Sequence, residues 1–127
     1  MTLEAVSLAG LELGDGEALS VSFVGPRTMR RVNREFLGHD YLTDVICFDY
    51  RPLDGVGDDG AVAVEILVSP DMALENAERF GRSYESELML YVAHGVLHAA
   101  GYDDSTPDER RRMRRAERAV MEKIYRP

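Results

Sequence analysis

The sequence contains no tryptophan and only one cysteine, Cys47, among its 127 residues. A single cysteine excludes an internal disulfide and a zinc site built from cysteines. No apolar run approaches the roughly 20 residues that span a bilayer. Residues 1–13 are acidic where a secretory signal peptide would be basic. We therefore expect a cytoplasmic protein that makes no membrane contact.

Length and composition predict one domain over residues 1–127. The chain is 45% hydrophobic and 30% charged, which is typical of a globular protein. A domain of this length buries enough surface to fold without a metal or a disulfide. Any metal site must therefore have a functional reason.

Basic residues are gathered in two clusters of an otherwise acidic chain, whose net charge is −8. The first cluster contains Arg27, Arg30, Arg31 and Arg34, and the second contains Arg110, Arg111, Arg112, Arg114, Arg115, Arg118, Lys123 and Arg126. The acidic total argues against indiscriminate coating of nucleic acid, but each cluster is compatible with a phosphate-binding face. The alternative is that both are solvated helix faces paired with neighbouring acids.

Hydrophobic patterning predicts strands interleaved with helices. The strands are expected at residues 19–24, 43–50 and 61–68, and the polar loop 51–60 is expected to be disordered. Helices are expected to begin at Pro26, Pro70, Ser83 and Pro107, and glycines to end the first three at Gly38, Gly81 and Gly101. This order predicts an α+β fold, with one small mixed sheet packed against about four helices, although the strand order cannot be read.

His94 and His98 lie four residues apart on the predicted helix from Ser83 to Ala100, which is apolar almost all the way round and therefore buried. Their side chains share one face, about 6 Å apart along the axis, as in helices that offer two imidazoles to one zinc ion. Gly95 stands where zinc proteases of the H-E-x-x-H type carry their general base, so proteolysis is disfavoured.

A third ligand is expected just beyond Gly101, where the chain can turn back toward the two histidines. Asp104 is the main candidate, with Asp103 as the competing ligand or as a group that orients a histidine. A His2Asp set leaves one tetrahedral position open for water, as in catalytic zinc sites. The alternative is that both histidines are hydrogen-bonded core residues.

Three segments resemble motifs of the bacterial YbeY family. Residues 94–104 (HGVLHAAGYDD), with Glu109, Met113 and Glu117 downstream, are similar to its H-G-x-L-H-x-x-G-Y-D-H signature and following helix. Residues 43–48 (TDVICF), preceded by Val32-Asn33, resemble its T-D-V-L-S-F strand, and residues 64–69 (VEILVS) resemble its G-D-I-x-I-S strand. The matches keep the family's order from residue 19 to residue 122.

The resemblance implies a zinc-containing endoribonuclease specific for single-stranded RNA, which acts in maturation of the 16S rRNA 3′ end and in ribosome quality control. One Zn2+ per chain would lie on His94, His98 and Asp104, and the partners would be 16S rRNA and the small ribosomal subunit, with no DNA expected. Thr43 and Asp44 would line the same cleft, with Asp44 as a second carboxylate, although a strand-end Asp often caps its own loop. Arginines would hold the RNA backbone: Arg34, Arg111, Arg114 and Arg115.

The sequence departs from the family pattern in three places. Asp104 replaces the third ligand histidine, which adds a negative charge and would weaken the metal as a Lewis acid. Leu37 stands where the family has an arginine, so that only neighbours such as Arg34 could stabilise a phosphoryl transition state. The segment before Leu19 is short for the family's first strand and helix. Asp104 and Leu37 together favour an alternative function, a ribosome-assembly factor that binds RNA or a protein without cutting.

Overall fold

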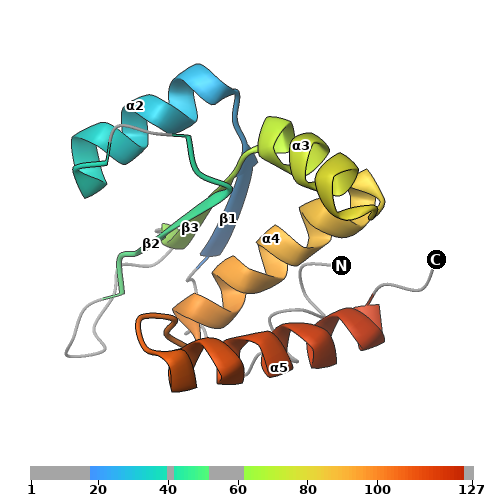
Figure 1. The fold of residues 1–127 in the computed structure, drawn as a ribbon. Coiled ribbons are helices and arrows are strands. Elements are labelled where there is room, and N and C mark those ends of the chain that lie inside the picture. Colours follow the sequence, from blue (N-terminus) through green and yellow to red (C-terminus); the bar gives the residue numbers. More distant parts are fainter. Residues whose placement is uncertain (1–17, 40–41, 52–61, 125–127) are drawn as a thin grey trace.

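The computed structural model describes residues 18–39, 42–51 and 62–124. In this part of the chain, strands are interleaved with helices as the sequence predicts, and the last three elements are all helices (Figure 1). The strands are β1 (Ala18–Phe23), β2 (Val45–Asp49) and β3 (Val62–Val68), and the helices are α2 (Pro26–Leu37), α3 (Pro70–Phe80), α4 (Tyr84–Ala99) and α5 (Pro107–Ile124). The predicted disordered loop 51–60 lies, apart from Arg51, outside the described residues, as do residues 1–17 before β1.

The sheet has the order β1-β3-β2, with β1 parallel and β2 antiparallel to the central β3. Val68, near the end of β3, is level with Phe23 on one side and Val45 on the other. The central strand is the most buried of the three, and its Val64, Ile66 and Val68 are fully buried. The predicted mixed sheet and α+β class are confirmed.

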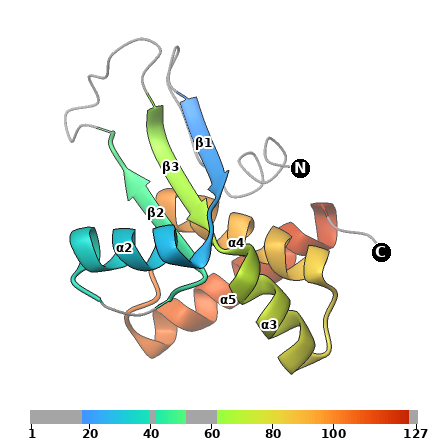
Figure 2. The ribbon, with the colours of Figure 1, turned by 90° about the horizontal axis from the view of Figure 1, so that it is seen from above.

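Helices lie on both faces of the sheet (Figure 2), and alternate residues of β3 belong to two different cores. Ile66 belongs to the larger core, to which α4 contributes Val96. Leu67 belongs to a smaller cluster with Met29 of α2 and Ile46 of β2. Helix α4 is therefore buried between the sheet and helices α3 and α5, as its apolar sequence predicts.

Helix ends follow the predicted local signals. The Ser69 and Ser83 hydroxyls accept hydrogen bonds from the amides of Met72 and Ser86, at 3.2 and 3.1 Å. Thr106 and Glu109 form a capping box at the start of α5. The Thr106 hydroxyl accepts a hydrogen bond from the Glu109 amide at 3.1 Å. In return, the Glu109 carboxylate accepts a hydrogen bond from the Thr106 amide at 2.9 Å. Glycines with positive φ follow α2, α3 and α4: Gly38, Gly81 and Gly101. These caps fix where the loops that carry polar groups begin.

Within the described residues, no helix is both long and apolar enough to cross a membrane.

Strand β2 begins at Val45, two residues later than predicted, because the side chain of Asp44 accepts a hydrogen bond from the Val45 amide at 2.8 Å. Thr43 and Asp44 therefore belong to the loop that leads into the strand.

Candidate functional site: a histidine and carboxylate cluster

Gly95 positions the histidine-bearing face of α4 over the sheet. A Cβ atom at this position would lie 2.8 Å from Cγ2 of Ile66, so the helix can pack at this distance only with glycine. The neighbouring His94 is half-buried beside this contact, and His98, one turn later, is exposed. Gly95, at the position where H-E-x-x-H proteases carry their general base, thus faces the core and not the histidine cluster.

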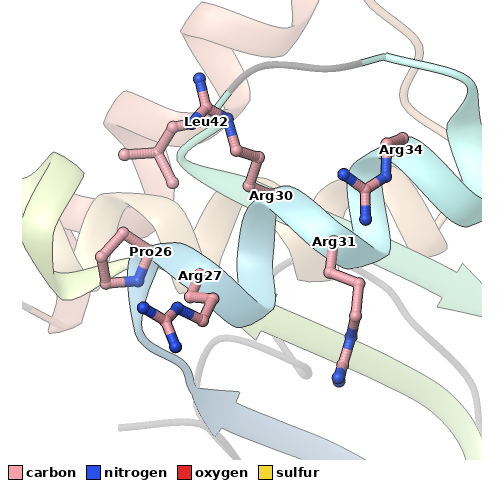
Figure 3. A pocket seen from close by; sticks show the side chains of 6 residues that line it. All are labelled: Pro26, Arg27, Arg30, Arg31, Arg34 and Leu42. Carbon is pink, nitrogen blue, oxygen red and sulfur yellow. The ribbon is translucent and has the colours of Figure 1, made fainter.

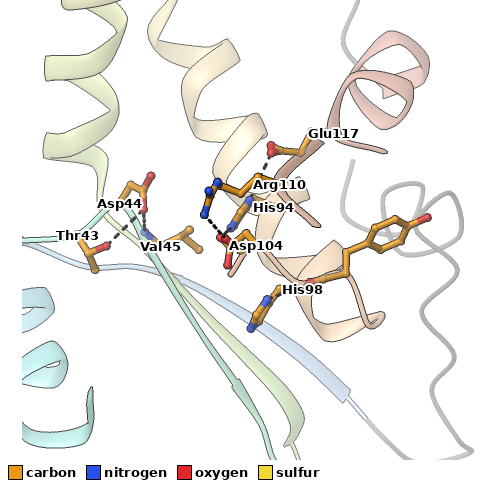
Figure 4. A network of polar contacts seen from close by, with 9 residues as sticks. Thr43, Asp44, Val45, His94, His98, Asp104, Arg110 and Glu117 are labelled. Atoms are coloured by element: carbon orange, nitrogen blue, oxygen red, sulfur yellow. Dashed lines mark hydrogen bonds and ion pairs between the residues drawn. The ribbon is translucent and has the colours of Figure 1, made fainter. Parts of the chain in front are cut away.

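His94 lies between two carboxylates (Figure 4). Its Nδ1 is 3.4 Å from Oε1 of Glu117 on α5, and its Nε2 is 3.6 Å from Oδ2 of Asp104 in the loop before α5. A carboxylate that accepts from Nδ1 holds the ring in one orientation and directs Nε2 toward the site. Helix α5 brings Glu117 there because Met113 and Val120, on the same face, are buried in the core.

The electrostatic environment of His94 favours its charged form. Burial, the largest single cause, lowers the pKa of the imidazole, whereas the hydrogen bond and the charge of Glu117 raise it. The charges of Asp104 and Asp44 add to the effect of Glu117, so that the pKa of His94 is raised above its usual value.

His98 is oriented by the turn that follows α4. Its Nδ1 lies 3.2 Å from the carbonyl oxygen of Tyr102, and because a carbonyl can only accept, Nδ1 carries a proton and the lone pair of the neutral ring is on Nε2. The turn passes through Gly101, with φ 110°, and the Tyr102 amide donates to the Leu97 carbonyl at 3.1 Å. The predicted turn back toward the histidines is therefore present.

The donor chemistry of these residues suits a metal site, but the three predicted ligands do not converge. In both histidines Nδ1 has an oxygen acceptor, the arrangement that metal-binding imidazoles need. In the described part of the chain, however, no three His, Cys, Asp or Glu side chains lie close enough together to hold a metal ion. The structure places Asp104 next to His94, whereas Asp103 lines a small hollow together with Tyr102, Glu109 and Arg112.

Asp44 is fixed at the start of β2 and its charge acts on His94. Its Oδ1 accepts from the Val45 amide at 2.8 Å and lies 3.4 Å from the Thr43 hydroxyl, which donates to it. Its backbone carbonyl accepts from the Ser69 amide at 2.9 Å, which joins this loop to the end of β3. Asp44 thus caps the start of its strand, and its charge also acts on the histidine cluster. The predicted role as a cap is therefore compatible with the predicted role as a second carboxylate of the site.

The predicted RNA-binding arginines lie in different surroundings. Arg34 lines a hollow of about 570 Å³ on α2 together with three other arginines, Pro26 and Leu42 (Figure 3). Arg114 lines a second hollow, between α4 and α5. Arg111 is paired with Asp108 on its own helix, and Arg115 is exposed. Arg34 and Arg114 are therefore the two that line hollows of the surface.

Sequence reasoning missed Glu117 and Arg110 as neighbours of the histidines. Glu117 stands on the apolar face of α5, between Met113 and Val120, and an acid in such a stripe is the signal that it pairs with a buried group. Arg110 donates to the Ser105 and Asp104 carbonyl oxygens at 3.2 and 3.4 Å, and its guanidinium lies beside His94 and Asp104 (Figure 4). Nothing in its sequence position separates Arg110 from the other arginines of α5.

A second ion pair fixes the other end of the site. Arg51 binds Asp49 of β2 and also donates to the Ala99 carbonyl at the end of α4, each at 2.5 Å. The hydrogen bond from Arg51 lowers the pKa of Asp49, with a smaller contribution from the charge of His98. The C-terminal end of α4, which carries His98, is thereby tied to β2.

Comparison with known proteins agrees with this architecture. The family model described as Endoribonuclease YbeY matches residues 3–125. A protein named Endoribonuclease YbeY from Chlorobium phaeovibrioides is 47% identical over 116 residues, which cover 90% of this chain and 74% of that protein. Another of that name, from Chlorobaculum parvum, is 39% identical and covers 95% of this chain and 82% of its own length. A solution structure of a Thermotoga maritima protein aligns with a TM-score of 0.58 and 26% identity, covering 94% of this chain and 78% of that one.

Proposed function

Because the chain belongs to the YbeY family of endoribonucleases, we propose that it hydrolyses phosphodiester bonds of single-stranded RNA at the cluster around His94. Cleavage of RNA is the activity of the family, and the substrate and the residue roles given below are our proposal. The observation that carries the assignment of the site is the position of His94 between Glu117 and Asp104.

His94, His98 and Asp104 are the residues that would hold a divalent metal, with zinc as the proposed ion. Both imidazoles present an oriented Nε2, and the Asp104 carboxylate is already beside one of them. A metal bound there would supply Lewis acidity toward a phosphate oxygen and lower the pKa of a bound water.

Asp44 is the proposed general base. Its carboxylate is held in one orientation by the Val45 amide and the Thr43 hydroxyl, and its charge reaches the cluster. In this role it takes a proton from the attacking water as the water oxygen bonds to phosphorus and a phosphorus–oxygen ester bond breaks. Thr43 acts as a positioning residue through its hydrogen bond to Asp44.

The proposed substrate is the 3′-end region of 16S rRNA, processed in the cytoplasm in connection with the small ribosomal subunit and with ribosome quality control. The hollow on α2 supports an RNA substrate, because it combines four arginines with an apolar surface at Leu42, next to Thr43 and Asp44 (Figure 3). Arginines suit phosphate because the guanidinium donates several hydrogen bonds in a fixed plane. We propose that Arg34 contacts the RNA backbone here.

Cleavage assays with purified protein test this proposal. We expect His98→Ala to abolish cleavage of a labelled single-stranded RNA and Asp44→Asn to reduce it by about 10²-fold or more, the usual contribution of a general base. His39→Ala is the matched control, since His39 follows α2 and is not among the residues proposed to bind metal or substrate, and it should cleave as the wild type does. Unchanged cleavage by Asp44→Asn, with none by His98→Ala, would remove Asp44 from the mechanism.

A second candidate function is a ribosome-assembly factor that binds RNA or a protein partner without cutting. It is favoured by one observation, that the three predicted metal ligands do not converge within the described residues. If this function is correct, His94→Ala restores growth of a deletion strain as well as the wild-type gene does. Failure to restore growth, with normal protein levels, would support the nuclease.

A further inference from the structure

A groove between α4 and α5 extends away from the histidine cluster. It has a volume of about 630 Å³, within the range of about 300–1,000 Å³ typical of ligand sites. Its floor is apolar, with Leu90 of α4 and Met121 of α5, and its walls include Arg114 and Arg118. Glu117 belongs both to this groove and to the cluster, where it contacts His94. The groove is therefore continuous with the candidate active site.

The two helices present matching rows of side chains to this groove. Leu90 stands one turn before His94 on α4, so both fall on one face of that helix, about 6 Å apart along the axis. On α5, Arg110, Arg114 and Arg118 recur every four residues and likewise share a face. The helices run in opposite directions (Figure 1), so this arginine row starts beside Asp104 and continues along the groove.

The charges along the groove favour an anionic occupant. Within the described residues, no hydrogen bond or ion pair engages the guanidinium of Arg114 or Arg118. Two carboxylates also line the groove, but that of Glu117 is directed to His94, which leaves only Glu122 at the far end. A third arginine of the groove, Arg82, is paired with Glu87. The other two, above an apolar floor, match a nucleic-acid strand, whose phosphates bind guanidinium groups while sugars and bases contact apolar side chains.

We propose that single-stranded RNA leaves the active site along the groove between α4 and α5, with successive phosphates bound by Arg110, Arg114 and Arg118. The proposal rests on the proposed nuclease function and adds the path of the strand. It separates the arginines of α5 into two classes, because Arg111 and Arg115 do not line the groove and Arg111 is paired with Asp108.

The test compares two double variants of one helix in the full-length protein. Binding of a fluorescein-labelled 12-nucleotide single-stranded RNA is followed by anisotropy between 50 and 200 mM salt, with a gel to show that the RNA stays intact. Each phosphate contact contributes about 0.7 to the slope of log K against log salt for a single strand. Arg114→Gln/Arg118→Gln should lower that slope by about 1.4, which corresponds to about 25-fold weaker binding at 0.1 M salt. Arg111→Gln/Arg115→Gln, the matched control, should keep the wild-type slope.

Two further variants guard against a folding defect and against general electrostatics. Arg114→Lys/Arg118→Lys keeps both charges and should keep most of the slope, and far-UV circular dichroism reports whether each variant is folded. Glu122→Gln should bind RNA about two- to threefold more tightly, because it removes the remaining carboxylate of the groove.

The possible results are distinguishable. Equal loss of slope in both Gln variants would refute the proposed RNA path, since α5 would then act only through its total charge. An unchanged slope in Arg114→Gln/Arg118→Gln, with normal wild-type binding, would also refute the proposed RNA path. The groove would then be expected to bind a protein partner instead. Absence of RNA binding by the wild type would count against the proposed function itself.

Discussion

Gly95 determines how closely α4 approaches the sheet, and we predict that any side chain there destabilises the protein. A Cβ would lie 2.8 Å from Cγ2 and 3.1 Å from Cδ1 of Ile66. Ile66 is fully buried and cannot move into solvent. Overpacking of this kind costs about 1–3 kcal/mol, whereas alanine gains about 1 kcal/mol in helix propensity over glycine. The net loss for Gly95→Ala is therefore about 1 kcal/mol of unfolding free energy.

Gly95→Glu, which would recreate the H-E-x-x-H pattern of zinc proteases, should be far more damaging. The carboxylate would be forced against the apolar side chain of Ile66, and an unpaired buried charge costs about 3–5 kcal/mol in addition to the steric cost. That is a large part of the about 5–15 kcal/mol by which domains are stable. We expect this variant to be largely unfolded and to have no protease activity.

Urea unfolding followed by far-UV circular dichroism measures both effects, since the chain has no tryptophan to serve as a fluorescent probe. Gly25→Ala is the control, because nothing lies within 4 Å of the added Cβ and the φ of −71° suits alanine. Because Gly25 is also the N-cap of α2, where alanine is less favourable than glycine, its stability should fall by no more than about 1 kcal/mol, without any steric cost. The packing argument would be refuted if Gly95→Glu unfolded within about 1 kcal/mol of the wild type.

Two other predictions concern titration. Glu117→Gln should lower the pKa of His94, followed by NMR in metal-free protein, because the variant removes the charge of Glu117 that opposes the effect of burial and leaves only a neutral acceptor for the Nδ1 proton. A raised histidine pKa stabilises the native state fully only below the ordinary histidine pKa. The stability lost in Glu117→Gln should therefore be largest at acidic pH and shrink as pH rises. A loss of stability that did not depend on pH would contradict this explanation. Burial raises the pKa of the Cys47 thiol to about 11 from 9.0, so alkylation at pH 8 should be about 100-fold slower than in denatured protein, and equal rates would contradict it.

The sequence predicted most element boundaries because local signals determine them. Pro70 at the first position, Ser69 as cap and Gly81 after the last turn define α3 without reference to the rest of the chain. Strand order was not predictable, because β1 and β3 pair in parallel through residues more than 40 positions apart, such as Phe23 and Val68. Pairing of that kind depends on the whole topology.

The candidate site was predictable where its residues share one helix or one turn. The spacing of His94 and His98 and the return of the chain to Asp104 follow from helix geometry and from Gly101. Glu117 reaches His94 only because α5 packs on α4, 23 residues later in the chain. Sequence spacing alone carries no information about such contacts, which is why this carboxylate was missed as a partner of the histidine.

The distribution of charge explains how an acidic protein could bind RNA selectively. The net charge of −8 repels polyanions at long range and weakens nonspecific association. Arginines gather instead in two hollows, one reaching Leu42 beside Thr43 and the other reaching Glu117 beside His94. At physiological salt the screening length is about 8 Å, so local guanidinium groups outweigh distant carboxylates at each hollow. Each hollow thus has one residue that contacts or adjoins the cluster, so we expect a strand that occupies both hollows to pass the histidines.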